Sequence, residues 1–402
     1  MLIAVVSFLG GLVLLLVAGR ILVDASTRIG AVFGLPATVI GLTIVAGGTS
    51  APELAVVLQS LRVGDPELAV GSIIGSNIAN ILLVLGLAAL VGSIKVSSRV
   101  VRIDIPFMIA ASLTVLVMAI DGQLSRGEGL LLVAALVAFI SWTIRSNGRS
   151  EAEGRSTREA GAPSRTPDRS LRLAGARLSS WGWVAEMTLL GISIGGLAAA
   201  ARFVVAGAEQ IAINLDLPEL IVGLTIVALG TSAPEIATTL VAAIKGQRDL
   251  AVGNAIGSNI FNLLLVLGLS STIGSGGLSF SADAVSLDLP IMVVAAVACL
   301  PLVFWDHTLR RWEGGVFVAF YLAYLTFLGL DATDHWMGDP FAVVMVSFVA
   351  PITVLTIAVI IVRRHRRSAD RHGQSGGQPD RVPTTRSSIG AFGGVQSNVD
   401  VS

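Results

Sequence analysis

The chain has little charge, few aromatic residues and a single cysteine. Lys, Arg, Asp and Glu together make up only 13% of the 402 residues and aromatic residues only 5%, whereas hydrophobic residues make up 53%. A soluble chain of this length would need far more charge to cover its surface, so the composition indicates an integral membrane protein. The 27 basic and 27 acidic residues cancel, and this excludes a nucleic-acid partner that a summed basic surface would attract.

Disulfide chemistry and histidine-dependent chemistry are also unsupported. Cys299 is the only cysteine, so no intramolecular disulfide can form. The four histidines all lie outside the apolar segments, and a nucleophilic serine within the membrane would therefore lack a histidine base. This weighs against an intramembrane hydrolase at residues 191–195, where the sequence GISIG is better explained by small residues that pack helices.

The most informative feature that is present is an internal repeat. Residues 41–87 recur without a gap at residues 223–269, and roughly two-thirds of the aligned positions are identical. Each copy places one glutamate, Glu53 or Glu235, in an apolar stretch that glycine and proline interrupt. Duplicated segments of this kind, at matching places in two halves of a chain, indicate the binding site of a transporter.

Apolar windows of about 20 residues predict two sets of five membrane spans and one further span. Five is an odd number, so the second set should be oriented opposite to the first, which makes the repeat an inverted one. The predicted fold is an all-α integral membrane protein of two inverted five-helix repeats, with an eleventh C-terminal span and broken helices at an ion site. The spans are predicted at residues 2–24, 35–60, 66–92, 101–120, 127–145, 180–210, 217–243, 249–274, 286–304, 312–331 and 340–362.

Basic residues outside the spans predict the sidedness. Short basic loops stay in the cytoplasm, so the Arg-rich linker at 145–178 and the basic run at 363–367 are placed there. Alternation of the spans then places the N-terminus outside and the C-terminus in the cytoplasm. The first apolar segment is expected to be a retained span rather than a cleaved signal peptide. The other basic loops fall on the cytoplasmic side as well, and they carry Lys95, Arg99, Arg102, Lys245, Arg248, Arg310 and Arg311.

These boundaries divide the chain into five segments. The linker is expected to be a simple hinge, and the tail is expected to be disordered because it is rich in Gly, Ser, Arg and Pro. The segments are the first repeat at 1–144, the linker at 145–178, the second repeat at 179–331, the extra helix at 340–362 and the tail at 363–402.

The sequence GTSAPE occurs at residues 48–53 and again at 230–235. Pro52 and Pro234 cannot donate a backbone hydrogen bond and clash with the carbonyl one turn earlier, which predicts a broken helix with free carbonyl oxygens. Membranes tolerate broken helices where these line a cavity or bind ions. The following glutamates would place two negative charges in a medium of low dielectric constant, which is costly without a cation between them. Further oxygens are offered by the hydroxyls of Thr49, Ser50, Thr231 and Ser232.

A second motif reads GSNIAN at residues 75–80 and GSNIFN at 257–262, and it is predicted to break the next helix of each half. Within it Ser76 and Asn80 lie four residues apart and share a helix face, as do Ser258 and Asn262. The two motifs together offer carboxylate, hydroxyl, amide and carbonyl oxygens without Cys or His. This ligand set favours a hard cation such as Ca²⁺ or Na⁺ over Zn²⁺ or Cu⁺.

The motif pair GTSxPE and GSNIxN, present twice, resembles the two alpha-repeats of the sodium/calcium exchanger family, within the calcium:cation antiporters. The resemblance implies a central Ca²⁺ site flanked by Na⁺ sites and alternating access driven by the Na⁺ gradient, with the ions as cargo and no cofactor. It implies that Glu53 and Glu235 bind Ca²⁺ together with the carbonyls of Thr49 and Thr231. It further implies one Na⁺ site at Ala46, Thr49, Ser50 and Ser76, another at Ala228, Thr231, Ser232 and Ser258, and a centre lined by Asn80 and Asn262.

Two other transport modes stay open on these residues. In H⁺/Ca²⁺ exchange, protonated Glu53 and Glu235 would replace Na⁺, but proton-coupled relatives resemble each other through GNxxE-type repeats that this chain lacks. A passive channel is disfavoured because broken-helix inverted repeats usually serve alternating access. Asn262 stands where potassium-dependent members carry Asp, which disfavours K⁺ co-transport. The expected location is the plasma or inner membrane of a prokaryote, and no obligate protein partner is expected.

Overall fold

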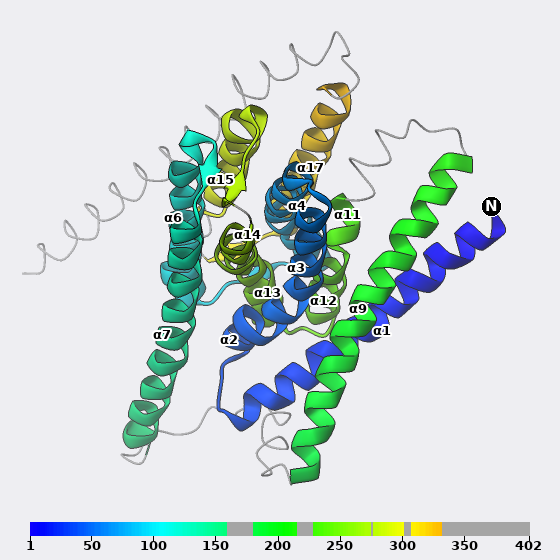
Figure 1. Cartoon of the computed structure of the whole chain (residues 1–402). Coiled ribbons are helices and arrows are strands. Elements are labelled where there is room, and N and C mark those ends of the chain that lie inside the picture. The colour runs from blue at the N-terminus through cyan, green and yellow to red at the C-terminus, as the bar shows by residue number, and fades with distance from the viewer. Residues whose placement is uncertain (159–179, 215–227, 275, 301–306, 332–402) are drawn as a thin grey trace, which may run out of the picture. The chain divides into compact units, whose positions relative to one another are not determined.

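The computed structural model describes residues 1–158, 180–214, 228–274, 276–300 and 307–331 (Figure 1). The chain divides into two units, 1–357 and 358–402, and all the described residues belong to the first. The predicted eleventh span, the tail and residues 159–178 of the linker therefore lie outside the described residues.

The described part of the first half is helical apart from short connections and two short strands. Its elements are α1 (Leu2–Val32), α2 (Ala37–Ile40), the π-helix η1 (Gly41–Val45), α3 (Ala46–Val63), α4 (Pro66–Ala79), the π-helix η2 (Asn80–Leu85), α5 (Gly86–Val91), β1 (Ile94–Lys95), the π-helix η3 (Val100–Asp104), α6 (Ile105–Met118), the short 3-10 helix η4 (Ala119–Asp121), β2 (Gln123–Leu124) and α7 (Arg126–Arg158).

The described part of the second half repeats much of this order. Its elements are α9 (Ser180–Asn214), α11 (Ala228–Thr231), α12 (Ala233–Ile244), α13 (Arg248–Phe261), the π-helix η6 (Asn262–Val266), α14 (Leu267–Ile273), β3 (Leu278–Ser279), the π-helix η7 (Ala284–Asp288), α15 (Leu289–Val297), β4 (Thr308–Leu309) and α17 (Arg311–Asp331).

Eight of the described helices are long and apolar enough to cross a membrane, and each lies at one of the predicted spans. The predicted spans 217–243 and 286–304 are described only in part, and they contain the shorter apolar helices Ala233–Ile244 and Ala284–Val297. The α7 helix continues to Arg158, well into the segment predicted as linker. The eight long helices are Leu2–Val32, Ala37–Val63, Pro66–Val91, Val100–Asp121, Arg126–Ser146, Gly182–Asn214, Arg248–Ile273 and Arg311–Leu330.

The two GTSAPE motifs have different backbones, which partly corrects the prediction of a break at each proline. The α3 helix runs unbroken through Pro52, and the irregular backbone lies before it, in the π-helix η1. In the second copy the helix is interrupted at Ser232, between α11 and α12. Pro234 then falls in the first turn of α12, where a missing N–H leaves no hydrogen bond unmade.

The two GSNIxN motifs do not break their helices, so the predicted break is wrong at this place. Instead α4 passes into η2 at Asn80, and α13 passes into η6 at Asn262, before α-helix resumes in each half. A π-helix bonds each N–H to the carbonyl five residues earlier and so widens the helix locally. The same widening begins at the equivalent asparagine in both copies.

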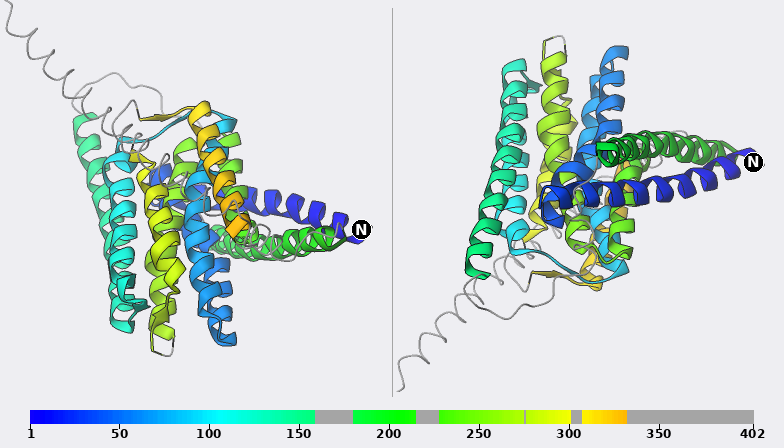
Figure 2. Two further views of the ribbon diagram at one scale, coloured as in Figure 1. Left: turned by 90° about the horizontal axis from the view of Figure 1, so that it is seen from above. Right: turned by 90° about the horizontal axis from the view of Figure 1, so that it is seen from below.

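The long helices α1 and α9 occupy equivalent places in the two halves and lie side by side (Figures 1 and 2). They run in opposite directions, because Gly11 of α1 meets Val204, whereas Arg28 near its other end pairs with Glu186. Small residues allow a close approach of membrane helices. At Gly207 the approach is tight enough that a Cβ atom would lie 2.5 Å from the backbone nitrogen of Phe8.

Two short antiparallel ribbons connect loops of one half to loops of the other. β1 pairs with β4 through Ile94 and Leu309, and β2 pairs with β3 through Leu124 and Leu278. The loops that carry β1 and β4 are both predicted to be cytoplasmic, and those that carry β2 and β3 are both predicted to lie outside. Each ribbon therefore joins loops from the same predicted side of the membrane.

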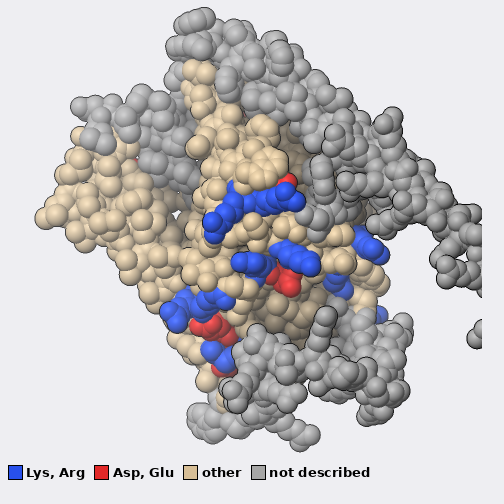
Figure 3. Space-filling model, turned by 180° about the vertical axis from the view of Figure 1, so that it is seen from behind, with Lys and Arg blue, Asp and Glu red and all other residues tan. Residues whose placement is uncertain are grey.

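Basic side chains gather across one face of the described structure, seen from behind in Figure 3. Several of the residues in the predicted cytoplasmic loops make contacts that hold neighbouring segments together. Arg311 donates to the backbone carbonyl of Val91 at 3.0 Å, and Lys245 pairs with Asp24 of α1.

We expect Gly207→Ala to destabilise the protein, because its Cβ would collide with backbone atoms of α1 that cannot move aside locally. Overpacking of this kind costs about 1–3 kcal/mol, which should lower the midpoint of thermal unfolding in detergent. Gly10→Ala is the control, since a Cβ there meets nothing within 4 Å. Equal unfolding midpoints for the two variants would contradict the α1–α9 packing.

Candidate cation site

The predicted site residues of both halves come together in the packed centre, where α3 and α4 meet α11, α12 and α13. The side chain of Thr231 is partly exposed, and that of Ala228 lies outside the described side chains. The remaining ten predicted residues are all buried: Ala46, Thr49, Ser50, Glu53, Ser76, Asn80, Ser232, Glu235, Ser258 and Asn262.

Hydroxyl groups connect each GTSAPE motif with the GSNIxN motif of the opposite half. The Thr49 Oγ1 lies 3.3 Å from the Ser258 Oγ. The equivalent pair is Ser76 and Thr231, whose oxygens are 3.4 Å apart, and Ser232 also donates to the Ser76 Oγ at 3.3 Å. The contacts between Thr49 and Ser258 and between Thr231 and Ser76 thus join residues that the family resemblance assigns to different Na⁺ sites.

The two glutamates lie close to each other in the centre of this arrangement. The carboxylate of Glu53 is near Ser76 and Asn262, while that of Glu235 is near Glu53 and Thr49. None of the four carboxylate oxygens makes a well-formed hydrogen bond with a described residue, although Ser76, Asn262 and Thr49 place donor groups nearby. No Lys or Arg of the described residues lies within 4.0 Å of either carboxylate.

Further polar atoms in this centre are also left without partners among the described residues. They are the amide oxygens and nitrogens of Asn80 and Asn262 and the hydroxyl of Ser50. Buried polar atoms are nearly always paired, because an unpaired one forfeits its hydration without compensation. Their clustering around two carboxylates gives the centre many oxygen atoms that are free to coordinate a cation. No three His, Cys, Asp or Glu side chains of the described residues group together as a metal site, so hydroxyl, amide and carbonyl oxygens would have to complete the shell.

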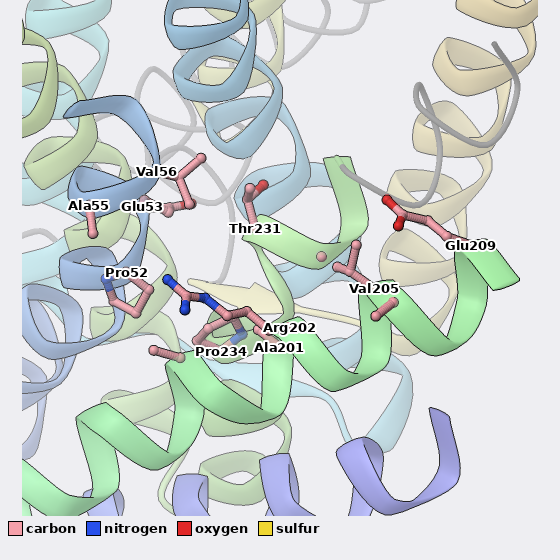
Figure 4. Close-up of a pocket in the computed structure, with 13 residues that line it drawn as sticks. Pro52, Glu53, Ala55, Val56, Ala201, Arg202, Val205, Glu209, Thr231 and Pro234 are labelled. Carbon is pink, nitrogen blue, oxygen red and sulfur yellow. The ribbon is translucent and has the colours of Figure 1, made fainter. Parts of the chain in front are cut away.

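A cavity of about 280 Å³ reaches this centre between α3, α9 and α11–α12 (Figure 4). Glu53 and Thr231 line it on the site's side, and α9 contributes Arg202 and Glu209. In Figure 4 the guanidinium of Arg202 extends toward Pro52, whereas the carboxylate of Glu209 points away. Arg202 forms no ion pair with a described acidic residue. Its equivalent in the first half, Arg20, lies 4.0 Å from Asp24.

The GISIG sequence and the asparagines Asn77 and Asn259 make hydrogen bonds within and between helices. Ser193 of the GISIG sequence donates to the carbonyl of Leu190 at 2.8 Å, within its own helix. Asn77 donates to the carbonyl of Ile73 at 2.7 Å, and Asn259 donates to the carbonyl of Asn77 at 3.2 Å. The last contact joins the two halves through equivalent asparagines.

One buried polar residue beside the site was not predicted from the sequence. Asn254 of α13 lies 3.4 Å from the hydroxyl of Thr49 and contacts two threonines of α12. The sequence could have pointed to Asn254 only through a difference between the two copies, because the first repeat carries Ser72 at the equivalent position.

Known proteins resemble the chain along most of its length. It is 38% identical over 304 residues to the inner membrane protein YrbG of Escherichia coli (strain K12), covering 74% of this chain and 89% of that protein. It is 29% identical over 342 residues to the sodium/calcium exchanger MaX1 of Methanosarcina acetivorans, covering 79% of this chain and 96% of that protein.

A solved structure and a family model lead to the same assignment as these relatives. A solved structure of the sodium-calcium exchanger NCX_Mj superposes with a TM-score of 0.65 at 28% sequence identity, covering 81% of this chain and 98% of that one. The family described as sodium/calcium exchanger protein matches residues 3–145 and 186–330. With its buried glutamates and duplicated motifs, the chain is a multi-pass membrane protein that belongs to the sodium/calcium exchanger family.

Proposed function

We propose that the protein is a secondary active antiporter that exchanges Ca²⁺ for Na⁺, with Ca²⁺ held between Glu53 and Glu235. The observation that carries this proposal is the group of four carboxylate oxygens buried between the two halves without partners among the described residues. Two buried negative charges are strongly disfavoured unless a cation neutralises them. Carboxylate and neutral oxygens together suit Ca²⁺.

The hydroxyl contacts suggest how the other oxygens divide between the ions. The carbonyls of Thr49 and Thr231 complete the Ca²⁺ site, and Asn80 and Asn262 line the centre. Because Ser258 contacts Thr49 and Ser76 contacts Thr231, we assign each serine to the Na⁺ site of the opposite half. One Na⁺ site then comprises Ala46, Thr49, Ser50 and Ser258, and the other Ala228, Thr231, Ser232 and Ser76.

The arrangement of the described helices supports an inverted repeat of five plus five spans. The apolar sequence at 340–362 would add the eleventh span. Opposite directions of α1 and α9 are what an inverted repeat requires of equivalent helices. The two ribbons, each joining loops of one predicted side, support the alternation of the spans. The basic loops then orient this alternation with the N-terminus outside and the C-terminus in the cytoplasm. The linker at 145–178 would then join the two halves in the cytoplasm, where the tail at 363–402 also lies.

The charge of the site accounts for obligate exchange. An empty centre with two negative charges resists the change of access, whereas a centre filled by Ca²⁺ or by Na⁺ ions permits it. The lining residues from α9 belong to its C-terminal half, which the proposed topology places toward the outside, so we infer that ions enter the cavity beside Glu53 from that side. The movement that switches access would be a displacement of α1 and α9 along the rest of the helices.

A second coupling ion is compatible with the same residues. Buried carboxylates without hydrogen-bond partners can also hold protons, so H⁺/Ca²⁺ exchange through Glu53 and Glu235 is the alternative. The two modes share the Ca²⁺ site and differ in what replaces Ca²⁺ there.

Replacing either glutamate by glutamine should abolish exchange, because each variant removes one of the two charges that hold Ca²⁺. We expect ⁴⁵Ca²⁺ uptake into Na⁺-loaded proteoliposomes to fall to the background level for Glu53→Gln and for Glu235→Gln. Ser193→Ala, which alters only a bond within α9, should transport normally. Undiminished flux in either glutamine variant would refute the assignment of the site.

Asn262→Asp should change the cation dependence of transport, because it adds a carboxylate beside Glu53. We expect a different Na⁺ requirement or a new stimulation by K⁺, measured as ⁴⁵Ca²⁺ uptake over a range of Na⁺ and K⁺ concentrations. Unchanged dependence on both ions would show that Asn262 is not a central ligand.

A cysteine in the cavity should be labelled from the outside. Val56 lines the cavity and is 38% exposed, whereas its neighbour Val57 is fully buried, and the natural Cys299 is buried. We therefore expect a membrane-impermeant maleimide to label Val56→Cys in intact cells and to leave Val57→Cys unlabelled. Labelling of Val56→Cys only in inside-out vesicles would reverse the proposed direction of opening.

A further inference from the structure

A chain of buried hydrogen bonds lies beside the site in the second half. Asn254 is completely buried, and its Nδ2 donates to the Oγ1 of Thr238 at 3.0 Å and to the Oγ1 of Thr239 at 2.8 Å. At the equivalent places the first repeat carries Ser72, Val56 and Val57, so it cannot form the same chain.

The donor and acceptor of each bond in this chain are determined by chemistry. The hydroxyl of Thr238 donates to the carbonyl of Pro234 at 2.8 Å, and it has only one proton to donate. Its oxygen must therefore accept from Asn254, which orients the Asn254 amide with Nδ2 toward the threonines. The amide oxygen then faces Thr49, the only one of these partners that belongs to the first half.

This orientation also gives the hydroxyl of Thr49 an acceptor in the second half. The Thr49 Oγ1 lies 3.2 Å from the carbonyl of Ala46, 3.3 Å from the Ser258 Oγ and 3.4 Å from the Asn254 Oδ1. The Ala46 carbonyl and the Asn254 amide oxygen can both only accept a hydrogen bond, and the Glu235 carboxylate lies near the same hydroxyl, so the proton of Thr49 is directed to these acceptors and not to Ser258. The lone pairs of Thr49 then remain available to coordinate a cation, while Asn254 holds the hydroxyl from the second half.

We propose that Asn254 is a positioning residue for the Na⁺ site at Ala46, Thr49, Ser50 and Ser258, an inference that rests on the Na⁺/Ca²⁺ exchange proposed above. It acts through Thr49, whose oxygen it keeps in the orientation that accepts a cation. At the equivalent position of the first repeat, the hydroxyl of Ser72 reaches no hydrogen-bond partner among the described residues, so Ser72 does not hold Thr231 in this way. The contact that Asn254 makes with one proposed Na⁺ site therefore has no counterpart from Ser72, and it comes from a residue outside the repeated motifs GTSAPE and GSNIxN.

The test compares the Na⁺ and Ca²⁺ dependence of exchange in reconstituted protein. Asn254→Ser places the residue of the first repeat in the second, and it should raise the Na⁺ concentration for half-maximal exchange about threefold to tenfold, the effect of one hydrogen bond. The Ca²⁺ concentration for half-maximal uptake should change by less than about twofold. A residue that served only to stabilise the fold would lower the amount of active protein and move neither concentration.

Two further variants keep the inference falsifiable. Thr238→Val preserves the shape of the side chain but removes the group that orients the amide, so it should raise the Na⁺ requirement in the same direction and be non-additive with Asn254→Ser. Ser72→Ala, at the equivalent position of the first repeat, should leave both ion dependences unchanged.

Three results would overturn the inference: an unchanged Na⁺ requirement in Asn254→Ser and Thr238→Val, a parallel shift of the Na⁺ and Ca²⁺ requirements, or an equal effect of Ser72→Ala. These results are distinct from a failure of the proposed function, in which the unmodified protein would show no Na⁺-dependent Ca²⁺ uptake at all.

Discussion

The burial of two carboxylates side by side, without a cationic or hydrogen-bonding partner among the described residues, is the constraint on which the rest of the structure depends. A single buried charge is costly in a membrane, and a second one of the same sign raises the cost through mutual repulsion. Around Glu53 and Glu235, oxygen atoms rather than Lys or Arg side chains are available to offset this cost. Such an arrangement is stable only when cations or protons arrive from solution, which makes the site a carrier of ions.

The internal repeat provides the geometry that this site requires. Neither half can build the site alone, because the GTSAPE motif of each half contacts the GSNIxN motif of the other through Thr49 and Ser258 or through Thr231 and Ser76. In the proposed exchange, a relative movement of the halves would therefore alter the coordination of all the bound ions together. The π-helices that begin at Asn80 and Asn262 widen both helices at the same depth, where the amides line the centre.

Much of this could be predicted from the sequence, because the chemistry of the site lies in two short repeated motifs. The glutamates, the hydroxyl residues and most spans follow from residue type, spacing and apolar length. The continuous helix through Pro52 could not be predicted from local backbone preference, since the π-helix before it alters the hydrogen-bond pattern. Three features depend on tertiary packing, which no local pattern contains: the contacts of Ser76 and Ser258 with the opposite half, the place of Arg202 in the cavity and the contacts of Asn254.

The measurement that tests the central claim most directly is ⁴⁵Ca²⁺ uptake into proteoliposomes that contain the purified protein. One set is loaded with Na⁺ at equal pH on both sides, and the other has an imposed pH gradient and no Na⁺. The account predicts uptake that requires internal Na⁺ and fails with the pH gradient alone. Uptake driven by the pH gradient without Na⁺ would contradict Na⁺ coupling, and uptake with neither gradient would contradict an exchanger altogether.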